Sequence, residues 1–172
     1  MCDHHEVKFN IQEEVPLKDF IELYHVFSYA PYNEKWSDEK IEIIYNSMKK
    51  EGKIVGLYDD TVCIGIITLT DKNQPLSFEN KSLYIADLAV YGPYRRHDAS
   101  GRLIDYAIEY AKEKGYKVLY LRTLEKGNSL DYDTFKVKNF KKINDKCQVI
   151  KIERTRVCKD EDCRIFMRCD IN

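Results

Sequence analysis

The alternation of apolar and polar residues predicts strands and helices arranged around one central unit. The run Leu83–Val90 is dense in β-forming residues and short enough to be a single buried strand. From Leu103 the apolar residues recur at helical spacing as far as Gly115, where a helix C-cap is expected. A second apolar strand, Val118–Leu121, follows at once. A helix that connects two short apolar strands predicts that the strands are parallel neighbours in one sheet.

The rest of the chain predicts further elements on both sides of this unit. Alternating or apolar segments predict strands at 6–11, 54–58, 61–70, 146–153 and 163–169. Apolar residues at helical spacing predict helices at 17–31, 37–50 and 129–138. Ser37 is the expected N-cap of the second of these helices, and the polar segment 71–81 is an expected loop. The order β-α-α-β-β-β-α-β-α-β-β predicts an α/β (α+β) fold, a mixed sheet of about seven strands with about four helices, and a ligand site near the carboxyl end of a central strand.

Composition narrows the class of protein. The 172 residues contain no Pro-, Ser- or Gly-rich linker, which predicts a single domain over residues 1–172. The net charge is −1 with acidic and basic residues interspersed, so neither a nucleic-acid nor a membrane surface is expected. With no signal segment and no long apolar run, we expect a cytoplasmic protein. The six cysteines are expected to be reduced, and their spacing does not predict a metal site.

Two groups of residues resemble a known family. Residues 88–95, with the sequence LAVYGPYR, are followed at 103–107 by LIDYA, and Asn128 is followed by Phe135, Lys136 and Phe140. Over nearly the whole chain, this pattern resembles the GNAT superfamily of N-acetyltransferases. The resemblance implies a GNAT fold and the transfer of an acetyl or other acyl group from coenzyme A to an amine.

The resemblance also implies where acetyl-CoA, the expected co-substrate, binds. In this family a strand parts from its neighbour, and its free backbone groups bind the pantetheine arm; Leu88 and Val90 are at these positions. The following turn and helix N-terminus bind the pyrophosphate. The residues expected to bind the donor are Leu88, Ala89, Val90, Arg95, Arg96, His97, Asp98, Ala99, Ser100, Gly101, Asn128 and Phe135.

The pyrophosphate loop departs from the family pattern of Arg or Gln, any two residues, Gly, any residue, then Gly or Ala. With Leu103 in the family register, Asp98 and Ser100 take the two glycine positions. Shifting the loop by one residue gives a closer match through Gly101, but it puts Asp105 at an apolar helix position. We prefer the first register.

Attack of an amine on a thioester requires a neutral amine and a proton for the departing thiolate. Asp87 is the only carboxylate in the central strand, so it is the candidate base, or the residue that holds a cationic amine. The segment Tyr84–Asp87 is similar to that of spermidine/spermine acetyltransferases, except that Ala86 replaces Glu. Phe135 takes the position of the family's proton-donating Tyr, so water is the alternative donor. By the same resemblance, Tyr29, Tyr32 and Trp36 line the acceptor pocket together with Asp87.

The function that these features predict is direct acetyl transfer from acetyl-CoA to a small primary amine. Direct transfer is preferred because no cysteine lies within the central motif. Two alternatives remain open. One is a catalytically impaired GNAT-fold module with a ligand-binding or regulatory role, which Asp98, Ser100 and Phe135 favour. The other is a homodimeric structural subunit that pairs through the last hairpin.

Overall fold

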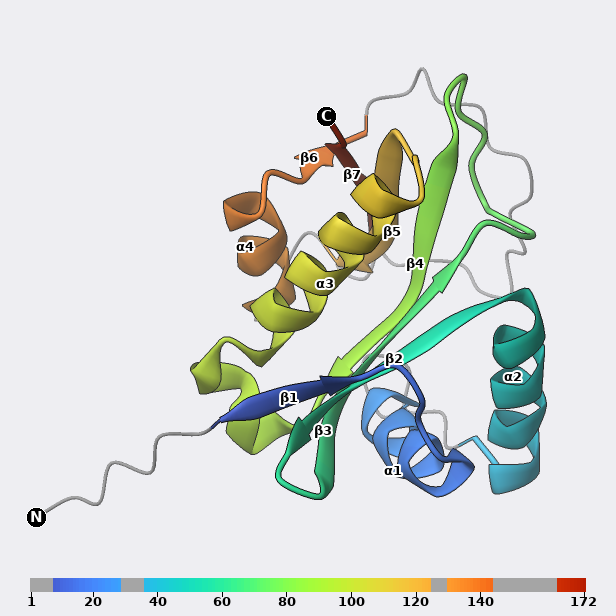
Figure 1. Cartoon of the computed structure of the whole chain (residues 1–172), viewed down its shortest axis with the longest axis vertical. Helices are drawn as coiled ribbons and strands as arrows, with labels where there is room; N and C mark the ends of the chain where they lie inside the picture. The colour runs from blue at the N-terminus through green and yellow to red at the C-terminus, as the bar shows by residue number, and fades with distance from the viewer. Residues whose placement is uncertain (1–7, 29–35, 125–129, 144–163) are drawn as a thin grey trace, which may run out of the picture.

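The computed structural model describes residues 8–28, 36–124, 130–143 and 164–172 (Figure 1). The strands are β1 (Phe9–Gln12), β2 (Gly52–Asp59), β3 (Val62–Thr70), β4 (Ser82–Val90), β5 (Val118–Leu124), β6 (Lys141–Lys142) and β7 (Arg164–Asp170). The helices are α1 (Leu17–Ser28), α2 (Asp38–Glu51), α3 (Ala99–Glu113) and α4 (Leu130–Val137), with a 3-10 turn η1 at Gly92–His97.

The strands form one seven-stranded sheet in the order β1-β2-β3-β4-β5-β7-β6. Within the described ranges, β4 and β5 are the one parallel pair, and the other neighbours are antiparallel. The mixed sheet and the parallel central pair are therefore as the sequence predicts. The strand predicted at 146–153 lies outside the described residues, and the two-residue β6 pairs with β7 at the last place in the sheet.

Helices cover both faces of the sheet because its strands bury side chains on both sides. Ile66 and Ile67 are consecutive in β3 and both fully buried, so they project to opposite faces. Ile67 belongs to a core with Leu103 of α3, whereas Ile66 belongs to a separate core with Phe20 of α1 and Ile41 of α2. Figure 1 shows α1 and α2 apart from α3 and α4. A carboxylate on β4 can therefore face either of two different environments.

The helix ends follow local chemistry that the sequence carries. The Lys40 amide donates to Ser37 Oγ at 3.2 Å, which confirms Ser37 as the N-cap of α2. Gly115, just beyond α3, has a φ of +78°, which glycine adopts readily. Helix α3 begins at Ala99, earlier than the apolar spacing predicts. Its Leu103 is fully buried and its Asp105 is exposed, in agreement with the preferred register.

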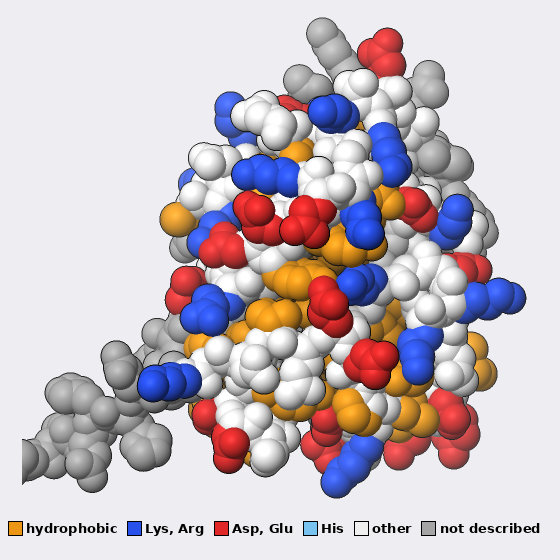
Figure 2. Space-filling view, viewed as in Figure 1, with side chains coloured by type: hydrophobic (Ala, Val, Ile, Leu, Met, Phe, Trp, Pro, Cys, Tyr) orange, Lys and Arg blue, Asp and Glu red, His pale blue; other side chains and the backbone are white. Residues whose placement is uncertain are grey.

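The surface mixes charges of both signs. Figure 2 shows acidic and basic side chains intermingled over the visible face, as the interspersed sequence predicts. Among the described residues, no helix is both long and apolar enough to span a bilayer.

Candidate functional site

The central parallel strands part halfway along their length. β4 and β5 pair from Ser82 with Val118 to Ile85 with Leu121. Beyond this point β5 continues along β7, while β4 continues along β3 as far as Val90. Among the described residues, the last part of β4 is therefore paired along one edge only.

The parting leaves the backbone of alternate β4 residues at the open edge. The Tyr91 amide donates to the Ile64 carbonyl at 2.8 Å, which fixes the alternation of the antiparallel ladder. Counting back from Tyr91, Ala89 and Asp87 turn their backbone groups toward β3. Leu88 and Val90 turn theirs toward the opening. This is the backbone geometry expected for these two residues, although it leaves their binding role a prediction.

A β-bulge in β4 decides where Asp87 points. Thr68 pairs with Asp87, but the next β3 residue, Leu69, pairs with Ile85, so Ala86 is an extra residue. The side chains of Ile85 and Leu88 consequently lie on the α3 side of the sheet, whereas Asp87 reaches α1. In a regular strand, Ile85 and Asp87 are two positions apart and would share one face. The bulge thus separates the carboxylate from the aliphatic core.

Two hydroxyl groups hold the Asp87 carboxylate. Thr68 Oγ1 donates to Oδ2 at 2.8 Å, and the Tyr24 hydroxyl donates to Oδ1 at 3.2 Å. Burial raises the pKa of Asp87, and both hydrogen bonds oppose this shift because they favour the charged form. Although the residue as a whole is partly exposed, Thr68 and Tyr24 are both buried. The carboxylate is thus held by two buried side chains, and it has a stronger tendency to accept a proton than an exposed Asp.

Tyr24 links the Asp87 carboxylate to a cluster of aromatic rings at α1. Tyr24 contacts Phe20 with a ring-centroid distance of 5.2 Å and Trp36 with one of 5.5 Å. The Lys40 ammonium lies 4.2 Å from the centre of the Trp36 ring. The Trp36 ring therefore already accepts a cation within the chain. Tyr24 contacts both Asp87 and Trp36, so the carboxylate and the Lys40–Trp36 pair belong to one group of contacts.

The turn after β4 is fixed to the far hairpin. Tyr94 of η1 donates its hydroxyl to Asp59 Oδ2 at 2.7 Å, and its ring meets Phe9 edge-on at 6.2 Å. The backbone of Arg95, Arg96 and His97 completes η1. The position of this turn relative to β4 thus depends on β1 and the β2–β3 hairpin.

The turn enters α3 through a left-handed residue. Asp98 has φ 58° and ψ 31°, and the next three residues, Ala99, Ser100 and Gly101, are buried. A Cβ at Gly101 would collide with the Asp98 carboxylate. The first turn of α3 thus presents its N-terminal end, where anions are favoured, beside the opening of β4 and beside a carboxylate.

The structure brings some of the expected site residues together and not others. Asp87, Leu88, Ala89 and Val90 share the parted strand, and residues 98–101 follow the turn. Trp36 is connected to Asp87 through Tyr24. Phe135 is buried against Phe140 in the core on the α3 side, so its binding role stays a prediction. The remaining candidates lie outside the described residues or side chains: Tyr29, Tyr32, Asn128 and the side chains of Arg95, Arg96 and His97.

Tyr24 and Thr68 join the candidate site through their bonds to Asp87, and the sequence did not reveal them. Tyr24 looks like part of the apolar stripe of α1, and Thr68 like an ordinary strand residue. Thr68 could have been found by pairing the predicted strands β3 and β4, because this pairing puts it opposite Asp87, the only carboxylate of the central strand.

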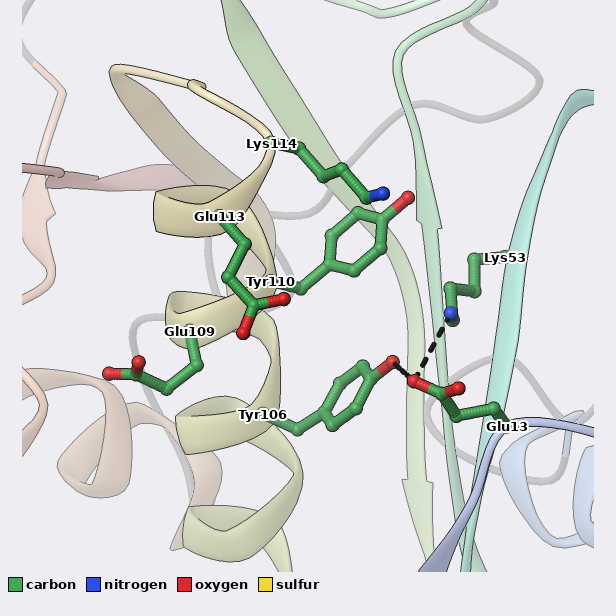
Figure 3. Close-up of a pocket in the computed structure, with 7 residues that line it drawn as sticks. All are labelled: Glu13, Lys53, Tyr106, Glu109, Tyr110, Glu113 and Lys114. Atoms are coloured by element: carbon green, nitrogen blue, oxygen red, sulfur yellow. Dashed lines mark hydrogen bonds and ion pairs between the residues drawn. The ribbon is translucent and has the colours of Figure 1, made fainter.

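A hollow of about 380 Å³ lies away from this site (Figure 3). It is bounded by the C-terminal half of α3, with Tyr106 and Tyr110, and by Glu13 and Lys53 near the start of the sheet. Glu13 accepts from the Tyr106 hydroxyl and lies 3.3 Å from the Lys53 ammonium. These polar groups satisfy one another, and the hollow is at the opposite end of α3 from the parted strands.

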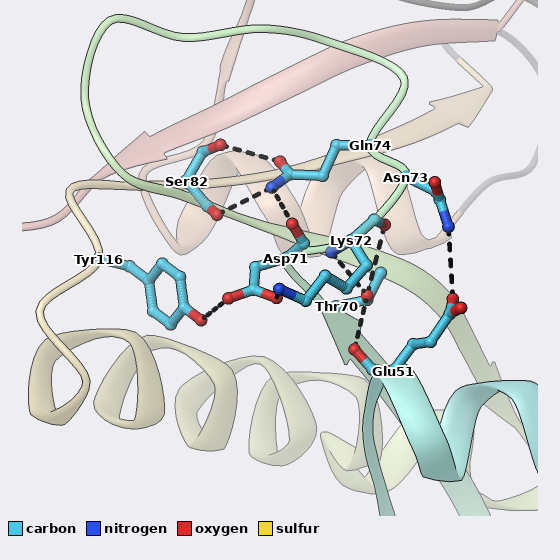
Figure 4. A network of polar contacts seen from close by, with 8 residues as sticks. All are labelled: Glu51, Thr70, Asp71, Lys72, Asn73, Gln74, Ser82 and Tyr116. Carbon is cyan, nitrogen blue, oxygen red and sulfur yellow. Dashed lines mark hydrogen bonds and ion pairs between the residues drawn. The ribbon is translucent and has the colours of Figure 1, made fainter.

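A second polar network fixes the loop between β3 and β4 (Figure 4). Asp71 accepts from the Tyr116 hydroxyl at 2.7 Å, and Gln74 exchanges hydrogen bonds with Ser82. The Asp71–Tyr116 pair joins a carboxylate to a tyrosine, as Asp87 and Tyr24 do, but at a distance from the parted strands. Among the described residues, no group of three His, Cys, Asp or Glu side chains is placed to hold a metal ion.

Solved structures share this fold. An acetyltransferase from Streptococcus agalactiae 2603 superposes with a TM-score of 0.70 at 17% identity, over 95% of this chain and 98% of that one. An N-acetyltransferase from Staphylococcus aureus Mu50 superposes with a TM-score of 0.71 at 14% identity, over 96% of this chain and 99% of that one. The putative acetyltransferase yncA from Salmonella typhimurium was solved with its cofactor acetyl-CoA. It superposes with a TM-score of 0.68 at 13% identity, over 95% of this chain and 94% of that one. No curated protein sequence matches the chain.

A seven-stranded mixed sheet with a parted parallel pair defines an acetyltransferase-type fold. The model of the acetyltransferase (GNAT) family matches residues 17–132, and the chain belongs to that family. Membership points to acetyl-CoA as the group that the site should fit. The open edge at Leu88 and Val90 and the N-terminus of α3 suit its amide arm and its anionic end. The Asp98 carboxylate beside that helix end does not suit the anionic end, because the two charges have the same sign.

Proposed function

We propose that this chain is an N-acetyltransferase that transfers an acetyl group directly from acetyl-CoA to a small primary amine. The observation that carries the proposal is the position of Asp87. It lies within the parted segment of β4, next to the open backbone edge at Leu88, and its side chain bonds to Tyr24 in the aromatic cluster of α1. A donor and an acceptor can meet there.

The donor half of the proposed site is backbone. The N–H and C=O groups of Leu88 and Val90 would pair with amides of the pantetheine arm, as a neighbouring strand would. The N-terminal end of α3 would interact with the anionic end of the molecule. Acetyl-CoA supplies the activated thioester, and the chain supplies its orientation.

The acceptor half combines a carboxylate with aromatic rings. The Asp87 carboxylate would attract a positively charged group, and Tyr24 joins it to the Trp36 ring, whose face carries the Lys40 ammonium. An amine that arrives protonated would be attracted to the Asp87 carboxylate. It must then lose a proton before its nitrogen can attack.

The proton transfers follow from the surroundings of Asp87. Because burial raises its pKa, the ionised carboxylate is a better base than an exposed Asp, and it would remove the proton from the amine, directly or through a water. The amine nitrogen then bonds to the thioester carbon and the C–S bond breaks, and the second proton that the nitrogen loses on becoming an amide passes through water to the departing thiolate. Phe135 is buried and has no proton to give.

The described cysteines support direct transfer. Burial raises the pKa of Cys63 to about 11, so its thiol is almost entirely protonated near neutral pH and would be a weak nucleophile. Burial also raises the pKa of Cys169. Both thiols are free, which agrees with the cytoplasmic location that we propose with this function.

A screen of primary amines with acetyl-CoA, which measures release of the free thiol, tests the proposal. We expect Asp87→Asn to lower turnover by about 100-fold, within the usual contribution of a general base. Asp71→Asn is the matched control, because it removes a tyrosine-bonded carboxylate outside the site and should keep wild-type turnover. Unchanged turnover and acceptor affinity in Asp87→Asn would remove Asp87 from both proposed roles.

A catalytically impaired ligand-binding module is the second candidate function. The carboxylate of Asp98 beside the anion-favouring end of α3 and the lack of a hydroxyl at Phe135 favour it. Thermal unfolding with millimolar acetyl-CoA, run beside the thiol assay, distinguishes the two. Stabilisation without thiol release from any amine supports the module, whereas release supports the enzyme.

A further inference from the structure

The residue that joins η1 to α3 has an unusual backbone conformation. Asp98 has a φ of 58°, in the left-handed region that glycine adopts without strain and that most other residues avoid. Asp is among the few side chains that tolerate this region. Glycine would adopt this backbone conformation without strain, so the conformation itself does not require a carboxylate at this position.

The Asp98 side chain lies against the first turn of α3. Three of its atoms, Cγ and both carboxylate oxygens, would lie within 3 Å of a Cβ placed on Gly101, so it fills the space that Gly101 leaves. It makes no capping hydrogen bond to the helix. The carboxylate is therefore beside the helix end without satisfying its N–H groups, and the residue is exposed.

We propose that Asp98 lowers the affinity of the donor site for the diphosphate of coenzyme A and so acts as a specificity-determining residue. This inference rests on the proposed function, because it assumes that coenzyme A binds across β4 and α3. A diphosphate drawn to the N-terminus of α3 meets a carboxylate of the same sign beside Gly101. Binding then requires either that the carboxylate swing into solvent or that the two charges repel each other.

The inference predicts a difference between two donor fragments. Pantetheine carries the amide arm without phosphate, so its affinity depends on the edge of β4 and not on Asp98. Coenzyme A carries the diphosphate, so its affinity depends on both. Two unit charges about 4 Å apart in water repel by about 1 kcal/mol, which corresponds to about a five-fold change in Kd.

Calorimetric titration of the full chain with coenzyme A and with pantetheine tests this. Asp98→Asn keeps the shape and removes the charge, and Asp98→Gly removes the side chain and suits the backbone. Both variants should bind coenzyme A about five-fold more tightly than the wild type, and pantetheine equally well. The gain should shrink in 1 M salt, where charges are screened within about 3 Å. Glu109→Gln, an exposed charge change further along α3, should leave both affinities unchanged.

The outcomes separate the inference from the proposed function. Equal coenzyme A affinity in the wild type and in Asp98→Asn would overturn the inference and leave the enzyme proposal intact. Equal gains for pantetheine and coenzyme A would also overturn it, since the effect would then not act on the diphosphate. If neither the wild type nor either variant binds coenzyme A, both proposals are wrong. Thermal unfolding of each variant without ligand confirms that it folds.

Discussion

Replacement of Thr68 by Val should change both the stability of the chain and the pH dependence of its turnover. The side chain is fully buried, and its hydroxyl donates to Asp87 at 2.8 Å. Valine has nearly the same shape, so Thr68→Val removes the hydrogen bond without opening a cavity. Tyr24→Phe removes the other donor to Asp87 and keeps the ring beside Phe20.

The size of the effect follows from the two distances. A hydrogen bond to a charged group contributes about 1.5–3 kcal/mol, and the shorter Thr68 bond belongs in this range. The Tyr24 bond is longer, at 3.2 Å, and should contribute about 1 kcal/mol. Both bonds favour the charged form and so lower the pKa of Asp87. Each substitution therefore raises that pKa further, and Thr68→Val raises it more.

The assay is kcat as a function of pH at saturating acetyl-CoA and amine. If Asp87 is the base, turnover rises with pH as its carboxylate ionises, and this acid limb should move to higher pH in Tyr24→Phe and further in Thr68→Val. Thr70→Val is the control, because Thr70 is also buried in β3 but donates to backbone carbonyls. It should cost stability in urea unfolding and leave the acid limb in place. An acid limb that Thr68→Val does not move would refute the assigned role of Asp87.

Three further predictions concern stability and the donor turn. Burial raises the folded-state pKa of Asp87 above its ordinary 3.8, so the wild type should lose stability relative to Asp87→Asn as pH rises from 3.8 through the folded-state pKa. Urea unfolding at several pH values measures this. A difference in unfolding free energy between the two proteins that stays constant with pH would contradict the prediction. Tyr94→Phe loses its bond to Asp59 and should raise the KM for acetyl-CoA by about five-fold at unchanged kcat; a fall in kcat alone would argue against a positioning role. Ser37→Ala should cost about 1 kcal/mol in unfolding free energy, whereas the mid-helix, exposed Ser47→Ala should cost none.

Local patterns in the sequence determine most of the fold. The parallel pair could be predicted because it follows from three local patterns, each formed by residues close together in the chain. These are the apolar run at 83–90, the helical spacing from Leu103 and the second apolar run at 118–121. Ser37 and Gly115 mark helix ends for the same reason. The family resemblance adds the parting of the central strands and the position of the donor turn.

The environment of the candidate base depends on contacts between distant segments. An extra residue, Ala86, turns Asp87 away from the α3 core, and only the pairing of β3 with β4 reveals it. Thr68 and Tyr24 are separated from Asp87 by 19 and 63 positions, so no local pattern links them to it. The sequence by itself thus determined the order of the elements and the presence of a carboxylate in the central strand. The tertiary structure decided which face that carboxylate reaches and which hydroxyls hold it, because a strand's facing and partners depend on its register with other strands.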